Sequence, residues 1–149
     1  MTDVSPAWRG RLLVALQFAA LAGVAFTGAV LPPNLPIGAL QLAAFALMGW
    51  TITLLGIGRF NARPEVHSRA RLVVSGPYRV VRHPMYAAVL TLALAWLLGR
   101  FTWYGLVCWA ALFAIAFAKM QIEEQALAVR FPEYATYRRR TARLLPGVF

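Results

Sequence analysis

The stretch LVVSGPYRVVRHPMYAAVL, residues 72–90, joins a basic loop to the start of an apolar segment. The letters SGP at residues 75–77 predict a turn, because glycine and proline favour turn conformations. Pro84 fits the first position of a helix, where its missing N–H is not needed. Tyr78 and Tyr86 flank the basic residues of the loop. The stretch therefore predicts a polar loop that leads directly into an apolar helix.

Apolar segments lie on both sides of this loop. The chain is 60% hydrophobic and only 13% charged, which excludes an ordinary soluble domain. Four segments lack Asp, Glu, Lys, Arg and His and are predicted to be transmembrane helices: residues 12–31, 37–58, 85–98 and 101–118. The third is short, and it spans a bilayer only if its flanks add length or protein surrounds its start. We predict a single domain, residues 1–149, that is an all-α integral membrane protein.

The basic residues predict how these helices are oriented. Of the 15 Lys and Arg, only Arg100 falls in a loop on the far side, and the others precede the first segment, lie in residues 59–83 or follow Ala118. By the positive-inside rule, residues 59–83 and 119–149 are cytoplasmic, as are both termini. The arginine- and alanine-rich, lysine-poor composition hints at a bacterial source, so we expect the bacterial cytoplasmic membrane.

The same distribution limits the classes of partner. The net charge of +10 is explained by topology and by anionic headgroups, and no nucleic-acid motif accompanies it. Cys108 is the only cysteine, which excludes disulfides and thiolate metal sites. With two histidines in a basic loop and no acidic cluster beside them, we expect no metal.

Residues 119–149 are predicted to begin as a helix, with Ile122, Ala126 and Val129 at helical spacing. Phe131-Pro132 should break this helix. The sequence PEYATYRRRTARLL then predicts a basic amphipathic helix along the membrane surface, with Tyr134 and Thr141 on one side.

The start of the third apolar segment has the features of a binding site for a small zwitterion. Pro84 would leave free amide donors at a helix N-terminus, which favours an anion, and Arg82 and His83 add donors at the same point. The rings of Tyr78 and Tyr86 could hold a cation. Taken singly, each residue also fits a structural role: arginines that anchor the loop to lipid phosphate, interfacial tyrosines, and a histidine that caps the helix.

The acidic residues form a second candidate feature. Lys119 and Glu123 are four residues apart and would also fit an ordinary surface ion pair. Glu123-Glu124 is harder to explain in this way, because two of only five acidic residues lie side by side in the most basic part of the chain.

Together these motifs resemble the isoprenylcysteine carboxyl methyltransferase family, whose relatives include the membrane phospholipid N-methyltransferases. The resemblance runs from Asn61 to Pro146. It rests on S-G-P-Y-R-V-V-R-H-P-M-Y, E-E-x-x-L, F-P-E-Y-x-x-Y-R-R-R and L-L-P-G. The first two apolar segments match only as generic membrane helices.

The resemblance implies an integral membrane enzyme that binds S-adenosylmethionine in a cytoplasmic pocket and methylates a lipidic or apolar acceptor. The implied cofactor contacts are Ala70, Arg71, Leu72, Val73, Tyr78, His83, Pro84, Met85 and Tyr86. The family's acceptor pair is an Arg followed four residues later by a Glu. Here this spacing holds Lys119 and Glu123, and lysine lacks the planar fork with which arginine grips a carboxylate.

The implied catalytic residues are Glu123, Lys119 and Glu124. A carboxylate acceptor of isoprenylcysteine type needs no base, whereas an amine acceptor does, and either glutamate could serve. If Glu123 faces the cleft, Glu124 lies about 100° around the helix and should tolerate substitution better. Phospholipid N-methylation is the alternative reaction, and a non-enzymatic scaffold or transporter subunit is the alternative of another class.

Overall fold

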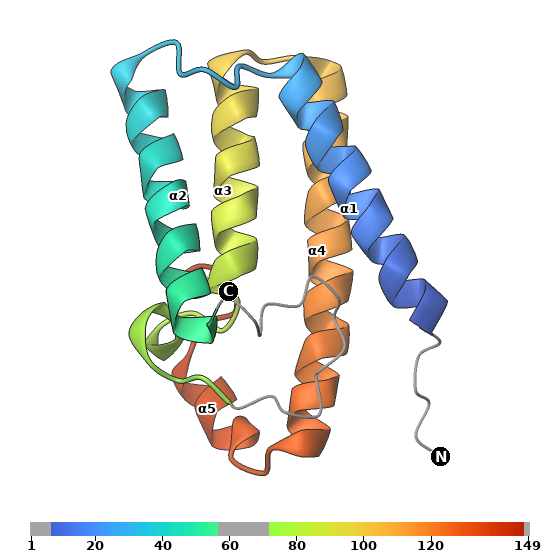
Figure 1. Cartoon of the computed structure of the whole chain (residues 1–149), viewed down its shortest axis with the longest axis vertical. Coiled ribbons are helices and arrows are strands. Elements are labelled where there is room, and N and C mark those ends of the chain that lie inside the picture. Colours follow the sequence, from blue (N-terminus) through green and yellow to red (C-terminus); the bar gives the residue numbers. More distant parts are fainter. Residues whose placement is uncertain (1–6, 57–71, 148–149) are drawn as a thin grey trace.

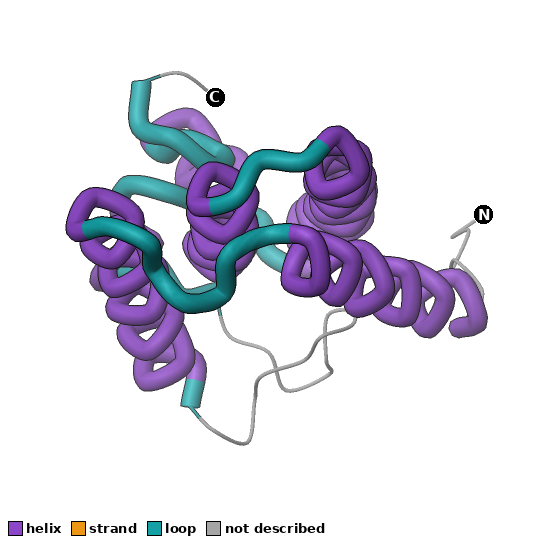
Figure 2. The backbone as a smooth tube through the Cα atoms, turned by 90° about the horizontal axis from the view of Figure 1, so that it is seen from above, coloured by secondary structure: helices purple, strands orange, loops and turns teal. Residues whose placement is uncertain are grey.

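Helices make up most of residues 7–56 and 72–147, the parts of the chain that the computed structural model describes (Figures 1 and 2). In chain order they are α1 (Ala7–Thr27), α2 (Leu35–Leu55), the short 3-10 helix η1 (Gly76–Arg79), α3 (Pro84–Gly99), α4 (Trp103–Arg130) and α5 (Tyr134–Arg140). These ranges contain no strand, which confirms the all-α prediction.

The first two helices each begin earlier and end earlier than predicted. The side chain of Asn34 accepts a hydrogen bond from the amide of Ile37 over 3.1 Å, and this cap fixes the start of α2 at Leu35. Gly56, with φ of +81°, ends the same helix, because glycine adopts this conformation without steric cost.

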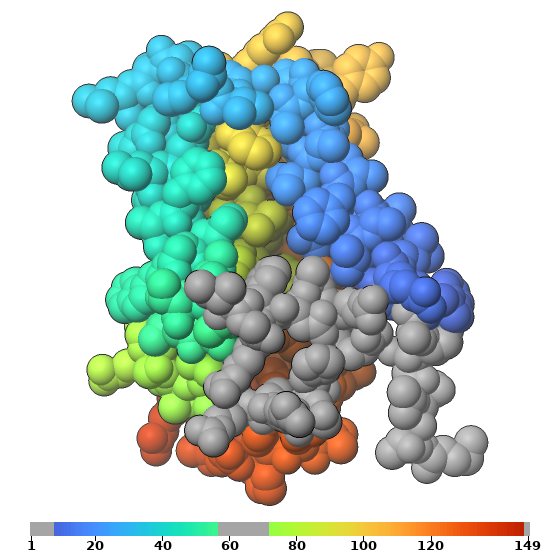
Figure 3. Space-filling model, viewed as in Figure 1, coloured from blue at the N-terminus to red at the C-terminus, as the bar shows by residue number. Residues whose placement is uncertain are grey.

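The helix α3 lies at the centre of the bundle. It packs against α2 on one side and against α4 and α1 on the other, and α1 tilts away from the other long helices (Figures 1 and 2). In the space-filling view α3 is recessed between α1 and α2 (Figure 3). Buried side chains lie all along it: Ala88, Leu90, Leu92, Ala93, Ala95 and Leu97. Protein rather than lipid therefore surrounds most of this short helix.

Large apolar side chains cover the outside of the bundle. Exposed examples on α1, α2 and α4 are Leu12, Leu16, Phe18, Phe26, Leu42, Phe45, Trp50, Val107 and Phe113. Exposed apolar surface of this extent requires an apolar environment. Within the described residues, α1, α2 and α4 are the helices long and apolar enough to cross a membrane. These features indicate a membrane protein.

The predicted third span, residues 85–98, corresponds to α3, which has 16 residues. At 1.5 Å per residue it is about 24 Å long, shorter than a hydrocarbon core of about 30 Å. By contrast α4 has 28 residues, or about 42 Å. Its last turns therefore extend beyond a core of that thickness, whereas a crossing by α3 stays a prediction.

The helix predicted after Pro132 is present as α5, but it is shorter than predicted. The helix α5 has only seven residues and ends at Arg140, so Thr141 does not continue the helical face of Tyr134. Thr141 is extended, and Ala142 forms an isolated parallel bridge with Val81. The break at Phe131-Pro132 is confirmed, since α4 ends at Arg130.

We expect Gly28→Ala to lower the free energy of unfolding by about 1–3 kcal/mol, the usual cost of overpacking. A Cβ at Gly28 would lie 2.6 Å from the carbonyl oxygen of Trp96, a main-chain atom with little freedom to move. Ala29 donates to the same oxygen over 2.9 Å. Denaturant unfolding in detergent micelles measures this loss. Gly49→Ala is the matched control, because a Cβ there meets nothing within 4 Å. Equal stability of the two variants would contradict the prediction.

Candidate active site

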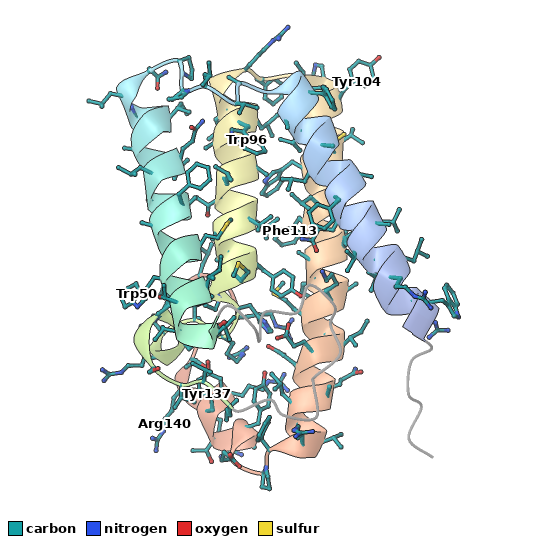
Figure 4. The ribbon with its side chains drawn as sticks, in the orientation of Figure 1. Trp50, Trp96, Tyr104, Phe113, Tyr137 and Arg140 are labelled. Atoms are coloured by element: carbon teal, nitrogen blue, oxygen red, sulfur yellow. The ribbon has the colours of Figure 1, made fainter. Side chains whose placement is uncertain are left out.

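Charged and polar side chains concentrate at the end of the bundle where α4 extends past α3 (Figure 4). The labelled Tyr137, on α5, lies at this end, whereas Trp96 and Tyr104 lie toward the opposite end (Figure 4). Five segments contribute to the cluster: α1, the loop before α3, the first turn of α3, the C-terminal half of α4, and the tail from α5 onward.

The carboxylate of Glu124, on α4, is the centre of this cluster. Arg82 Nε donates to Oε1 over 3.0 Å, His83 Nε2 lies 3.2 Å from the same oxygen, and Arg143 Nη2 donates to Oε2 over 2.7 Å. The exposed fractions of these four side chains are only 3–12%. Because a carboxylate only accepts hydrogen bonds, Nε2 of His83 carries the proton in this contact. Glu124 thus joins the loop before α3, α4 and the tail.

Main-chain hydrogen bonds also hold the loop before α3 and the tail together. The amide of Arg82 donates to the carbonyl oxygen of Ala142 over 2.8 Å, and the amide of Ala142 donates to that of Val80 over 2.9 Å. The Arg82 guanidinium also donates to the carbonyl oxygen of Thr141. The side chains that sequence reasoning assigned to an anion at the helix N-terminus, Arg82 and His83, are therefore engaged with the protein itself.

Lys119 lies one turn before Glu123 on α4, and the two charges attract each other. Its side chain is only 1% exposed. The ammonium donates to the side-chain oxygen of Gln17 on α1 and lies 5.6 Å from the centroid of the Tyr86 ring on α3. Three helices thus meet at Lys119.

Glu123 differs from its neighbour Glu124 in its surroundings. Its carboxylate lies 3.8 Å from Nδ1 of His83, and its side chain is 34% exposed. It is also close to the Tyr86 hydroxyl. Glu123 is therefore the glutamate that a ligand can reach, whereas the carboxylate of Glu124 is surrounded by basic groups of the protein.

The turn predicted at residues 75–77 is confirmed as η1, and it brings Tyr78 close to Glu123. Burial, with Glu123 and Tyr137 nearby, raises the pKa of Tyr78 well above its ordinary value. Burial also raises the pKa of Tyr137 to about 12, so its hydroxyl keeps its proton and donates to the carbonyl oxygen of Tyr78 over 2.8 Å. Both phenols are thus neutral donors at physiological pH.

The structure brings six of the predicted site residues together: Tyr78, His83, Tyr86, Lys119, Glu123 and Glu124. Pro84 and Met85 stand beside them in the first turn of α3. Leu72 lies apart, on the wall of a surface hollow of about 490 Å³ next to α5, and Val73 follows it in the same extended segment. Ala70 and Arg71 lie outside the described residues.

Sequence reasoning did not assign a role to two residues of the cluster, Gln17 and Arg143. Gln17 had a signal that could have found it, because it is the single hydrogen-bonding side chain between Arg11 and Thr27. Arg143 had none, since it is one of several arginines in the tail.

As a unit, the cluster presents the reachable carboxylate of Glu123 beside the buried ammonium of Lys119. The rings of Tyr78 and Tyr86 lie close to them. A carboxylate and aromatic faces attract a cation, and an ammonium attracts an anion. The site can therefore orient two charged groups of opposite sign next to each other.

Comparison with known proteins assigns the chain to a family. Residues 37–133 match the phospholipid methyltransferase family. The chain belongs to this family, and this confirms the resemblance predicted from the motifs.

Two curated relatives are also similar to the chain. The cobalt-zinc-cadmium resistance protein CzcN of Cupriavidus metallidurans is 37% identical over 102 residues, which cover 64% of this chain and 45% of that protein. The nickel-cobalt-cadmium resistance protein NccN of Alcaligenes xylosoxydans xylosoxydans is 32% identical over 102 residues, or 64% of this chain and 46% of that protein. The chain thus spans less than half the length of either relative.

Proposed function

We propose that this protein is a membrane methyltransferase that uses S-adenosylmethionine to methylate a carboxylate on a lipidic acceptor of isoprenylcysteine type. The observation that carries the proposal is the pairing of Lys119 and Glu123 beside Tyr86 at the polar end of an apolar bundle. Membership of the phospholipid methyltransferase family supports it. We further propose that this end faces the cytoplasm of a bacterial cell, with both termini on the same side.

The chemistry of the donor set fits S-adenosylmethionine. When bound, this cofactor supplies an activated methyl group on a sulfonium, and it also carries an ammonium and a carboxylate. Glu123 and the rings of Tyr78 and Tyr86 offer contacts for the positive groups. The amides at the start of α3, which begins with Pro84, offer contacts for the carboxylate. We therefore assign cofactor binding to Tyr78 and the first turn of α3.

The acceptor carboxylate is assigned to Lys119. A carboxylate that attacks as the anion needs no general base, so the protein has to orient it and keep water away. The ammonium can orient it through charge-assisted hydrogen bonds. Glu123, one turn away, attracts the ammonium of Lys119 and defines the side on which the acceptor binds. The exposed apolar faces of α1, α2 and α4 would admit the acceptor from the bilayer.

Phospholipid N-methylation is the second candidate. The family match favours it, and so does the reachable carboxylate of Glu123 close to His83, because an amine acceptor must lose a proton to a base. Turnover with a prenylated cysteine but not with phosphatidylethanolamine would decide for the carboxylate, and the reverse result for the amine.

We expect the purified protein to bind S-adenosylmethionine and Tyr78→Ala to weaken this binding by roughly ten- to a hundredfold, the usual effect of losing a hydrogen bond to a charged group. Calorimetric titration in detergent measures the change in affinity. Tyr104→Ala is the matched control, because Tyr104 is 80% exposed near the opposite end of the bundle (Figure 4). The same loss is expected for His83→Ala, but that variant also removes a partner of Glu124. No binding by the unmodified protein would refute the proposed function.

A further inference from the structure

The chain contains one lysine among its 15 Lys and Arg residues, and that lysine is Lys119. The other basic side chains are arginines, and many of them are exposed on the loops and the tail, including Arg79, Arg138, Arg139 and Arg140. The lysine is instead 1% exposed between helices. Placing an ammonium in such a position is costly unless the surroundings stabilise it, which is why buried charges in membrane helices usually have a function.

Gln17, on α1, is a polar partner that helps to stabilise the buried ammonium of Lys119. Its side-chain oxygen accepts a hydrogen bond from the ammonium of Lys119. From Leu12 to Phe26, all side chains except that of Gln17 are apolar, and Gly23 has none. The amide therefore has no general role in the solubility or packing of the helix. The helix α1 packs along α4, which sets the register of the contact. It also precedes residues 37–133, the region that matches the family.

The kind of oxygen that accepts the hydrogen bond from Lys119 determines the net charge at the site. A glutamine oxygen orients an ammonium without cancelling its charge, whereas a carboxylate at the same place would neutralise it. On another side of the ammonium, the Tyr86 ring at 5.6 Å attracts the cation without neutralising it. A lysine side chain has four flexible methylenes and three donors, so its partners decide where its charge points.

We propose that Gln17 is a positioning residue for the acceptor: it holds the Lys119 ammonium, still positively charged, in place to bind the acceptor's carboxylate. This inference rests on the proposed function, because it names the residue through which α1 takes part in the same site. The acceptor class that follows is a lipid with an anionic headgroup.

The single lysine allows a test that does not depend on turnover. Protein labelled with ¹³C at the lysine ε-carbon gives one side-chain NMR signal, from Lys119. We expect Gln17→Met, which removes the oxygen but keeps the length, to move this signal. Gln41→Met is the matched control, because Gln41 is likewise a glutamine in an apolar helix but lies on α2, away from Lys119. It should leave the signal unchanged.

Titration with N-acetyl-S-farnesylcysteine, a prenylated cysteine carboxylate, tests the role in binding. The lysine signal of the unmodified protein should shift as the probe is added, and in Gln17→Met the apparent Kd should rise about tenfold. In steady-state kinetics the KM for the probe should rise by a similar factor, while kcat changes less than about threefold. Gln17→Glu has nearly the same shape as glutamine and separates charge from sterics. It too should raise the KM, because its carboxylate cancels the ammonium.

The outcomes distinguish this inference from the function on which it rests. If the lysine signal responds to the probe in a Gln17-dependent way but no S-adenosylhomocysteine forms, the inference stands and the proposed reaction fails. If the reaction proceeds and the KM of Gln17→Met equals that of the unmodified protein, the inference is overturned. A normal KM in Gln17→Glu would also overturn it, since Gln17 would then only fill space.

Discussion

Replacing Glu124 by alanine is expected to lower the free energy of unfolding by about 3–5 kcal/mol, the usual cost of removing one partner from a buried ion cluster. The variant leaves Arg82 and Arg143 without the carboxylate that both contact, at exposed fractions of only 10% and 12%. It also removes the oxygen that lies 3.2 Å from His83 Nε2. Denaturant unfolding in detergent micelles measures the loss.

Glu133→Ala is the control for this variant, because Glu133 is exposed and its side chain makes no capping hydrogen bond at α5. Its stability should stay within about 0.5 kcal/mol of the unmodified protein, as for most surface substitutions. Glu124→Gln should fall between the two, since its amide oxygen still accepts hydrogen bonds but carries no charge. If Glu124→Ala were as stable as Glu133→Ala, other groups would have to hold the cluster together.

The second large effect is expected on turnover. Glu123→Gln should lower kcat by on the order of a hundredfold, the usual scale for losing one acid–base or positioning group. Its carboxylate is next to Lys119 and His83 yet remains reachable, which suits a residue that contacts ligands. The affinity for S-adenosylmethionine should stay within about threefold, because Tyr78 and the start of α3 remain. The rate of S-adenosylhomocysteine release measures turnover, with prenylated cysteine and phosphatidylethanolamine as alternative acceptors.

Glu133→Gln is the matched control for turnover, since it removes an acidic charge outside the cluster. Full activity of Glu123→Gln on whichever acceptor reacts would contradict its assignment. A rate that rises with pH in the unmodified protein and loses this dependence in Glu123→Gln would indicate an amine acceptor, because only an amine needs a base.

The two glutamates differ in their surroundings in a way that the helical spacing alone does not predict. The sequence pattern favoured Glu123 as functional and Glu124 as the more tolerant residue, because they lie about 100° apart on a helix. The structure supports Glu123 as the reachable group but surrounds Glu124 with three basic partners. We therefore expect Glu124 to be the less tolerant of the two for folding, and we propose a positioning role for it instead of a catalytic one.

The helices were predictable because their signals are local. Uncharged apolar runs identify α1, α2 and most of α4, and the turn before Tyr78 and the break at Phe131-Pro132 follow from glycine and proline. The observed helix ends differ from the predicted ones by a few residues, because capping residues determine them. Helix ends are the part of a helix that a sequence pattern predicts least well.

The contacts that assemble the site were not predictable, because they join residues far apart in the chain. Arg82 meets Glu124 across 42 positions, and Lys119 meets Gln17 across 102. The tail shows the same limit. Local periodicity predicted a helix that continues past Arg140. In the structure, pairing with Val80 and Val81 holds Ala142 in an extended conformation instead. No local pattern contains that partner.

The contact between Arg143 and Glu124 also imposes an order of events during biosynthesis. A ribosome makes α1, α2, α3 and α4 before it reaches Arg143, so until then Glu124 has only Arg82 and His83 of its three basic partners. The tail must then return to the loop before α3 to supply the third basic group. Synthesis of the helices and completion of the site are thus separate steps, and the second depends on a segment that is made after all four helices.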